Sequence, residues 1–370
     1  MANRALWLPK QNGTFEVGPA PDPVPGTKQM VVRPRAVAVN PIDRMLPALG
    51  AFITPWLVYP AIVGTDVAGE VIAVGSGVTR FKAGDRVVAF AASGDKGHTA
   101  AEGAFQEQVV IQEHMASPIP DALSFAAAAV LPLGICTAAS GLFQKDYLGL
   151  RHPSANAAPV GETVIIWGGS TSVGSNAIQL TKAAGYDVVT TCSPRNFEFV
   201  KQLGANAAFD YNSKTVVTDM IAALRGRTVA GAYALGAGAE GMCIDILGAS
   251  QGGKFVASAS QPISFDVPPS GRVSRLAMLP ALIRMWLATR ALTRKKKRAG
   301  VTSKFIWGST LQDNEVGPMI FADFLPGALA DGRYRAAPEP TVVGHGLEAI
   351  PKALEQLGRG VSASKLVVTL

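Results

Sequence analysis

A hydrophobic run near the middle of the chain passes directly into a turn of small residues. Residues 163–167 are mostly apolar, and seven small residues, 168–174, follow before a helical pattern begins. The first turn of such a helix offers free amides and a positive dipole end, which suit a pyrophosphate group. The spacing follows the dinucleotide pattern G-x-G-x-x-G with Thr171 at the middle glycine, and an ordinary tight turn is the alternative. The expected cofactor contacts are Gly169, Ser170, Thr171, Ser172 and Val173.

The end of the next apolar run bears on which dinucleotide is bound. About 20 residues after a glycine turn, an enzyme that uses NAD places an acidic residue against the adenosine ribose. Here the segment reads Ser193-Pro194-Arg195-Asn196 and holds no acid. Ser193 and Asn196 can hydrogen-bond a 2′-phosphate and Arg195 can supply its countercharge, so we expect NADPH. Alternatively, Ser193 caps a helix and Arg195 is a solvated surface charge.

The elements that must position these groups follow two different sequence patterns. The first third of the chain holds short runs rich in Val, Ile and Phe, bounded by Gly, Pro and Asp, which predict a small β-barrel. From about residue 163, apolar runs alternate with helical patterns, which predicts a parallel, doubly wound α/β sheet. The expected strands are 29–39, 67–74, 86–91, 105–111, 163–167, 187–191, 207–209, 231–235, 254–258 and 304–308, with helices from Gly174, Asn196, Thr215 and Ala239.

The last residues, 338–370, are too few for a separate domain. They carry an extended piece, a helical pattern at 347–357 and an apolar strand at 365–370. Because that strand can complete the first barrel, we expect a catalytic domain over 1–145, a nucleotide-binding domain over 146–315 and a return to the first domain over 316–370.

Three motifs together resemble one protein family. They are Asn40-Pro41-Ile42-Asp43, then Gly64-Thr65-Asp66-Val67-Ala68-Gly69, and a terminal Val361-Ser362-Ala363-Ser364-Lys365-Leu366-Val367. With the glycine turn, they resemble the medium-chain dehydrogenase/reductase superfamily over nearly the whole chain. They are most similar to its quinone and enoyl reductase branch and, within it, to the stand-alone enoyl reductases of fungal polyketide clusters. The resemblance implies a GroES-like barrel, a Rossmann domain and further cofactor contacts at Asn40, Pro41, Asp43, Leu235, Ser258, Val361 and Ser362.

The same resemblance bears on zinc. The zinc alcohol dehydrogenases carry a cysteine where this chain has Asn40-Pro41 and a histidine where it has Thr65. The lobe that holds four cysteines in those enzymes reads Ala91-Ala92-Ser93-Gly94-Asp95-Lys96-Gly97-His98 here. Catalytic zinc needs three protein ligands, so we expect that this protein binds no zinc. His98 and His114 are expected to lie on the surface. Without that Lewis acid, conjugate reduction of an enone or enoyl thioester is favoured over alcohol oxidation.

The residue that stabilises the reacting oxygen is less evident. Thr137 lies in the stretch that crosses between domains beside the nicotinamide in this family, and a helix-capping threonine is an equal alternative. Relatives often have a lysine soon after the Asn-Pro motif, where this chain has Arg44. Thr137 and Arg44 are therefore the expected catalytic residues, and water remains open as proton donor. Tyr211 looks like the residue that stacks beside the adenosine, or it is simply an aromatic at a strand end.

Composition limits which classes of ligand, partner and cellular location we expect. The net charge of +7 favours anionic ligands without indicating nucleic acid, and three separated cysteines fit a reducing cytosol. No signal peptide is visible, and the apolar run 123–143 reads as two buried helices because it contains Pro132 and Gly134. We therefore expect a cytoplasmic monomer or homodimer without a nucleic-acid or membrane partner. The basic block 294–298 is read as a solvated helix end, with docking to an acidic partner or membrane surface as the alternative.

Three functions remain open besides an NADPH-dependent enoyl or enone reductase. One is an NADPH:quinone reductase, for which the predicted loop 46–57 would decide the choice. The second is a protein that docks to a carrier-bound polyketide chain through the basic block. The third is a regulatory protein that binds a nucleotide without turnover.

Overall fold

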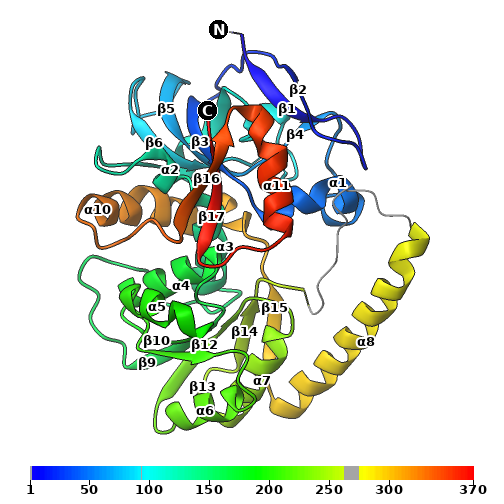
Figure 1. Cartoon of the computed structure of the whole chain (residues 1–370). Coiled ribbons are helices and arrows are strands. Elements are labelled where there is room, and N and C mark those ends of the chain that lie inside the picture. Colours follow the sequence, from blue (N-terminus) through cyan, green and yellow to red (C-terminus); the bar gives the residue numbers. More distant parts are fainter. Residues whose placement is uncertain (1, 93, 262–274) are drawn as a thin grey trace. The chain divides into compact units, whose positions relative to one another are not determined.

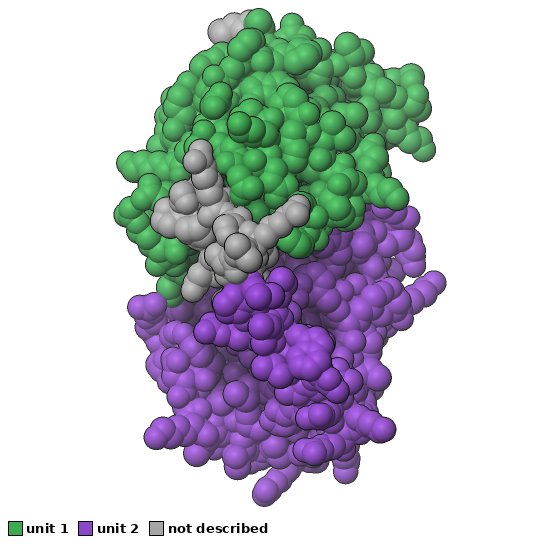
Figure 2. All heavy atoms as spheres, turned by 90° about the vertical axis from the view of Figure 1, so that its right-hand side faces the viewer, with its two compact units in different colours: residues 1–133, 266–274, 320–370 green, residues 134–265, 275–319 purple. Residues whose placement is uncertain are grey.

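The computed structural model describes residues 2–92, 94–261 and 275–370, and its described part divides into two compact units (Figures 1 and 2). Unit 1 comprises residues up to 133 and residues 320–370, and unit 2 comprises 134–261 and 275–319. The unit boundaries thus fall after residues 133 and 319, where the sequence placed its divisions after 145 and 315.

Unit 1 is built from β-sheet. Its larger sheet has the order β16-β17-β3-β5-β6-β8, with β7 also paired to β3, and a smaller sheet has the order β2-β1-β4. The strands are β1 Arg4–Leu8, β2 Glu16–Pro19, β3 Gln29–Ala38, β4 Ala61–Ile62, β5 Asp66–Val74, β6 Arg86–Phe90, β7 Val109–Gln112, β8 Ala116–Pro118, β16 Glu339–His345 and β17 Ser364–Thr369.

The C-terminal strand completes the sheet of unit 1. β17 pairs antiparallel with β3, with Val367 opposite Ala38 and Thr369 opposite Ala36. The apolar side chains of β17 and β3 pack into one core with α11 (Ile350–Gly358), which lies beside β17 in Figure 1. The last strand of the chain is thus part of the larger sheet of unit 1.

One element of unit 1 differs from expectation. Residues 46–57 were expected to form a loop, yet Pro41–Ile53 forms helix α1, which contains the poor helix formers Pro47 and Gly50. Asn40 precedes the helix, and its backbone N–H donates to Asp43 Oδ2 at 2.8 Å. Burial of Leu46, Ala48 and Leu49 outweighs the low propensity of the two helix breakers. The other helices of unit 1 are η1 Ala100–Glu102, η2 Glu113–Met115, α2 Phe125–Ala128, α10 Leu325–Ala330 and η6 Leu347–Ala349.

Unit 2 is a doubly wound α/β sheet, as the alternating pattern predicts. Its parallel strands have the order β11-β10-β9-β12-β14-β15, and the short β13 also pairs with β12. The strands are β9 Glu162–Trp167, β10 Asp187–Cys192, β11 Ala207–Asp210, β12 Thr228–Ala234, β13 Gln251–Gly252, β14 Phe255–Ser258 and β15 Thr302–Phe305.

Helices connect these strands and cover the sheet (Figure 1). They are α3 Pro132–Phe143, α4 Ser172–Ala183, η3 Pro194–Asn196, α5 Phe197–Gln202, α6 Val216–Ala223, α7 Ala239–Ala249, α8 Arg275–Ala299, η4 Thr310–Asp313 and α9 Val316–Pro318, and η5 Met319–Phe324 follows α9 at the boundary of the units. The apolar faces of α6 and α7 pack against β9 and β12 in one buried cluster. This packing fixes the carboxyl ends of the parallel strands at one edge of the sheet.

Three local features differ in detail from expectation. The strand expected at 105–111 is extended only from Val109 to Gln112, because Phe105 and Gln106 belong to a tight turn that bonds back to 63 and 104. The strand expected at 304–308 covers Thr302–Phe305, where it pairs with β14. His98 is not a freely exposed residue, because its ring lies 2.9 Å from Glu102 and is only 18% exposed.

The apolar stretch 125–143 has the length and composition that crossing a membrane requires. Among the described residues, one helical stretch meets this criterion. Within it, 72% of the most apolar window is buried inside the protein. Since α2 and α3 are separate helices divided near Pro132, the expected pair of buried helices is confirmed.

Candidate cofactor and active site

The glycine turn after β9 is a closed backbone cradle at the start of α4. Thr171 Oγ1 donates to the carbonyl of Gly168 at 2.9 Å and accepts from the amide of Gly174 at 3.0 Å. A Cβ at Gly174 would come within 2.2 Å of the Gly168 oxygen, so the turn requires glycine there. Thr171, at the position of the fingerprint's middle glycine, therefore caps the helix.

The first turn of α4 also holds a polar atom that fits an anionic ligand. Ser172 Oγ is buried and has no hydrogen-bond partner among the residues that the structure describes. The amides of a first helical turn likewise lack intrahelical partners. An orphaned hydroxyl beside these amides fits a phosphate group, so the residues of this turn satisfy the chemistry of a dinucleotide site.

A side chain of the segment after β10 contacts a side chain that follows β11. Ser193 Oγ lies 3.4 Å from the hydroxyl of Tyr211, and Ser193 makes no capping hydrogen bond to η3. Ser193 therefore occupies the N-cap position of η3 without a side-chain capping bond. Arg195 is exposed, and the structure gives it no ion pair among the residues it describes, whereas Asn196 is only 8% exposed. Arg195 is thus available to a ligand, and Asn196 is largely enclosed by protein.

Leu235 and Ser258 lie at the ends of neighbouring strands on the same edge. The Leu235 amide donates to the Trp167 carbonyl at 3.1 Å, and a Cβ at Gly168 would meet the Leu235 side chain at 3.0 Å. Ser258 Oγ donates to the Ser260 carbonyl at 3.1 Å and is nearly inaccessible. The fold therefore brings the unit 2 residues that the sequence singled out for cofactor binding to one sheet edge.

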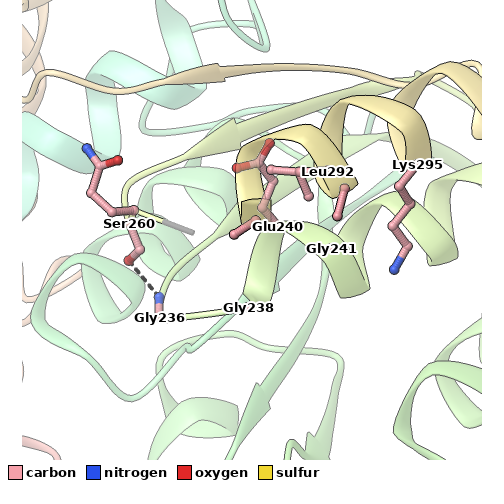
Figure 3. A pocket seen from close by; sticks show the side chains of 10 residues that line it. Gly236, Gly238, Glu240, Gly241, Ser260, Leu292 and Lys295 are labelled. Atoms are coloured by element: carbon pink, nitrogen blue, oxygen red, sulfur yellow. Dashed lines mark hydrogen bonds between the residues drawn. The ribbon is translucent and has the colours of Figure 1, made fainter. Parts of the chain in front are cut away.

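A pocket lies next to this edge (Figure 3). It has a volume of about 280 Å³ and is lined from the β12–α7 turn, the residues after β14 and the inner side of α8. The Gly236 amide donates to Ser260 Oγ at 2.7 Å, and Glu240 and Lys295 are among the other lining residues. The side chain of Leu292 from α8 lines the same pocket.

Unit 1 contains a separate buried polar cluster. Lys365 Nζ lies 2.9 Å from Asp66 Oδ2 and donates to Asn40 Oδ1 at 2.5 Å. Asn40 Nδ2 in turn donates to Asp66 Oδ2 at 2.9 Å and to Thr65 Oγ1 at 3.2 Å. The side chains of Lys365 and Asp66 are 6% and 0% exposed. A buried ammonium and a buried carboxylate thus contact each other directly, and the Asn40 side-chain amide bonds to both.

Asp43 lies at the edge of this cluster. Its Oδ2 accepts the Asn40 amide, while its Oδ1 is buried with no hydrogen-bond partner in the described part of the chain. Burial is the main reason that the pKa of the Asp43 carboxyl is raised to about 7, and the nearby Asp66 charge adds to the rise. Near neutral pH, Asp43 is therefore poised between its protonated and ionised forms.

The two expected catalytic residues lie in different units. Thr137 is in the middle of α3, so it does not cap that helix; its Oγ1 packs against Gly308, where a Cβ would come within 2.3 Å. Arg44 in α1 directs its guanidinium against Gly358 of α11. Pro41 is the exposed first residue of α1, and Val361 and Ser362 lie in the exposed turn before β17.

Sequence reasoning missed Asp66 and Lys365 as members of the site. Both stood in motifs that the sequence analysis quoted, but neither was assigned a role. A signal was present, since a lysine inside the apolar strand 364–369 must find a partner to be buried.

The comparisons with known proteins agree with this architecture. Residues 26–121 match the family described as "Alcohol dehydrogenase GroES-like domain". The dehydrogenase pigH of Monascus ruber is 48% identical over 371 residues, covering 100% of this chain and 99% of the relative. The chain belongs to the medium-chain dehydrogenase/reductase superfamily.

Other similar proteins belong to the enoyl reductase and quinone oxidoreductase branch of this superfamily. The trans-enoyl reductase himH of Aspergillus japonicus is 34% identical over 379 residues, covering 100% of this chain and 98% of the relative. The crystal structure of a quinone oxidoreductase from Pseudomonas syringae pv. Tomato superposes with a TM-score of 0.69 at 25% identity and covers 100% of both chains. The GroES-like and Rossmann parts expected from the motifs are thereby confirmed.

The polar cluster of unit 1 contains Asn40 and Thr65, the two residues on which the expectation of a zinc-free site rests. Across residues 2–92, 94–261 and 275–370, no three His, Cys, Asp or Glu side chains gather as a metal site. Ser93 of the lobe compared with the structural zinc site lies outside the described residues.

Proposed function

We propose that this protein is an NADPH-dependent reductase of an activated carbon–carbon double bond that works without zinc. The observation that carries the proposal is the cluster of Lys365, Asp66 and Asn40, where an ammonium group takes part in place of metal-binding donors. A cationic lysine and an amide are poor zinc ligands, so the cluster offers no Lewis acid for an alkoxide.

Conjugate reduction fits the groups that are present. NADPH, when bound, supplies a hydride, which adds to the β-carbon of an enone or enoyl thioester. The electron pair of the double bond then moves to the carbonyl oxygen as an enolate, and a proton from solvent or a side chain reaches the α-carbon. Because the enolate charge is delocalised, one or two hydrogen-bond donors stabilise it, and we assign Thr137 as the first of these.

The protein's own residues hold the cofactor in this proposal. The first turn of α4 and the Ser172 hydroxyl bind the pyrophosphate. Arg195 and Ser193 bind the adenosine 2′-phosphate, with the Tyr211 ring beside the adenosine and Ser193 held by the Tyr211 hydroxyl.

The relative that is named a trans-enoyl reductase supports the enoyl reductase assignment, and the quinone oxidoreductase structure favours a second candidate. A quinone reductase would use the same cofactor site and transfer hydride to a flat quinone. The test is NADPH consumption against matched panels of enones, acyl thioesters on a free or carrier-bound arm, and quinones. Turnover with enones or thioesters and formation of the saturated product support the proposal. Turnover confined to quinones would replace it, and no turnover would indicate a binding protein.

A further inference from the structure

Helix α8 presents an outer face that the other described residues leave uncovered. Five large apolar side chains of its first half are 43% to 55% exposed. They are Leu279, Leu282, Ile283, Trp286 and Leu287, which recur three or four residues apart and so share one side of the helix. An exposed apolar stripe of this length is unusual for a protein surface that has no partner.

The same side of α8 becomes basic toward its C-terminus. Arg290, Arg294 and Lys297 continue the spacing of Ile283 and Trp286, and all three are exposed. The guanidinium of Arg290 lies 4.6 Å from the Trp286 ring centre. No acidic residue occurs anywhere in Arg275–Ala299, so the whole face attracts anions.

The opposite side of α8 anchors the helix to unit 2. Leu292 and Ala299 pack against the buried cluster of the sheet, and Leu292 also lines the pocket of Figure 3. Lys295 forms an ion pair with Asp245 of α7 at 2.6 Å, and Lys296 donates to Ser303 of β15 at 3.0 Å. These contacts use the inner cations, so the outer face is left to a partner.

We propose that the outer face of α8 docks on a membrane surface that contains anionic lipids. Large apolar residues with a tryptophan, next to a cluster of Lys and Arg on one amphipathic helix, match the requirements of the membrane interface and of anionic headgroups. The apolar half enters the headgroup boundary, and Arg294, Lys297 and Arg298 contact lipid phosphates. A second copy of the chain is disfavoured because the basic halves repel.

A specific protein partner fits this face less well. Protein interfaces surround an apolar centre with a polar rim that pairs donors with acceptors. The outer face of α8 offers cations and two threonines, Thr289 and Thr293, but no carboxylate or amide. A fluid anionic surface needs no such pairing. The proposal concerns binding alone and is independent of the reaction.

The experiment is co-sedimentation of the full chain with vesicles of phosphatidylcholine alone or mixed with phosphatidylserine. We expect binding only to the mixed vesicles, weakened by salt. Arg294→Gln with Lys297→Gln should weaken it roughly 25-fold, since each cation near an anionic membrane contributes roughly fivefold. The matched control, Arg225→Gln with Lys352→Gln, removes two exposed cations elsewhere and should bind nearly as the wild type. Ile283→Ala with Trp286→Ala should cost at least roughly tenfold.

Four results would overturn the proposal. The first is equal binding to both kinds of vesicle, and the second is equal binding of the α8 pair and its control. The third is a loss of thermal stability or NADPH affinity in Ile283→Ala with Trp286→Ala without vesicles, which would mean that the chain itself covers the face. The fourth is binding to poly-glutamate but not to vesicles, which would assign the face to an acidic protein.

Discussion

Lys365 and Asp66 form an ion pair in the interior of unit 1, with 2.9 Å between the ammonium nitrogen and the carboxylate oxygen. Asn40 bonds to both partners, so three strand-end segments meet at this point. Asp66 Oδ1 also accepts the amide of Leu133 at 2.6 Å, at the start of α3. The pair therefore fixes the position of the Asn40-Pro41 turn and of the first residues of α3.

Removing one partner of this pair should destabilise the protein strongly. Lys365→Met leaves Asp66 buried and unpaired, so the free energy of unfolding should fall by about 3–5 kcal/mol. Chemical denaturation measures the change. The double variant Lys365→Met with Asp66→Asn should recover part of the loss. Lys201→Met breaks an exposed pair with Glu198 and should cost about 1 kcal/mol or less. Similar losses in the two single variants would contradict this account.

The cofactor preference should depend on Arg195. Arg195→Ala removes the countercharge of the 2′-phosphate, so NADPH binding should weaken by about 1.5–3 kcal/mol while NADH binding is nearly unchanged. Titration of protein fluorescence with both cofactors measures this difference. Arg225→Ala, an exposed arginine elsewhere in unit 2, should alter neither affinity. Equal losses for NADPH and NADH would show that Arg195 does not contact the 2′-phosphate.

The Asp43 carboxyl should give the protein a pH-dependent stability. Its pKa is raised from 3.8 to about 7, so the folded state binds a proton that the unfolded state has released. Stability from this group is therefore fully present below about pH 4 and is lost as the pH rises through about 7. Relative to Asp43→Asn, the wild type should lose unfolding free energy between about pH 4 and about pH 7. Parallel pH profiles for the two proteins would rule out the raised pKa.

Activity should not depend on a metal ion. Prolonged chelation should leave both the turnover rate and the melting temperature unchanged, because the polar cluster of unit 1 offers an ammonium and an amide where zinc enzymes offer ligands. Metal analysis of the active protein is the independent check. Stoichiometric zinc in active enzyme would refute this prediction.

Hydride should add to the β-carbon of the substrate and not to its carbonyl carbon. With an α,β-unsaturated ketone and NADPH deuterated at the transferred position, the label should appear at the β-carbon of the saturated ketone. Thr137→Val should slow turnover by about 10²-fold and spare NADPH binding, as the loss of a transition-state donor does. An allylic alcohol labelled at the carbonyl carbon would exclude conjugate reduction. Unchanged turnover in Thr137→Val would shift the oxygen contact to Arg44 or the cofactor's ribose hydroxyl.

Much of the nucleotide-binding unit could be predicted from the sequence, because its signals are local. The apolar strand, the small residues of the turn and the helix start at Ser172 are adjacent in the chain. Parallel strands joined by helices place their carboxyl ends at one edge, so Ser193, Tyr211 and Leu235 could be assigned to that edge without coordinates. The motifs Asn40-Pro41 and Lys365-Leu366 likewise sufficed for the family and for its GroES-like part.

Tertiary structure alone decided the rest. Helix α1 contains Pro47 and Gly50, and only burial of its apolar side against the core makes those residues helical. The contact between Lys365 and Asp66 joins residues from opposite ends of the chain, and no periodicity encodes such a pair. The sequence predicted the basic end of α8, but which of its sides faces unit 2 depends on packing around Leu292. The reason is general: local propensity and spacing act within a few residues, whereas burial and charge pairing depend on neighbours that the folded chain supplies.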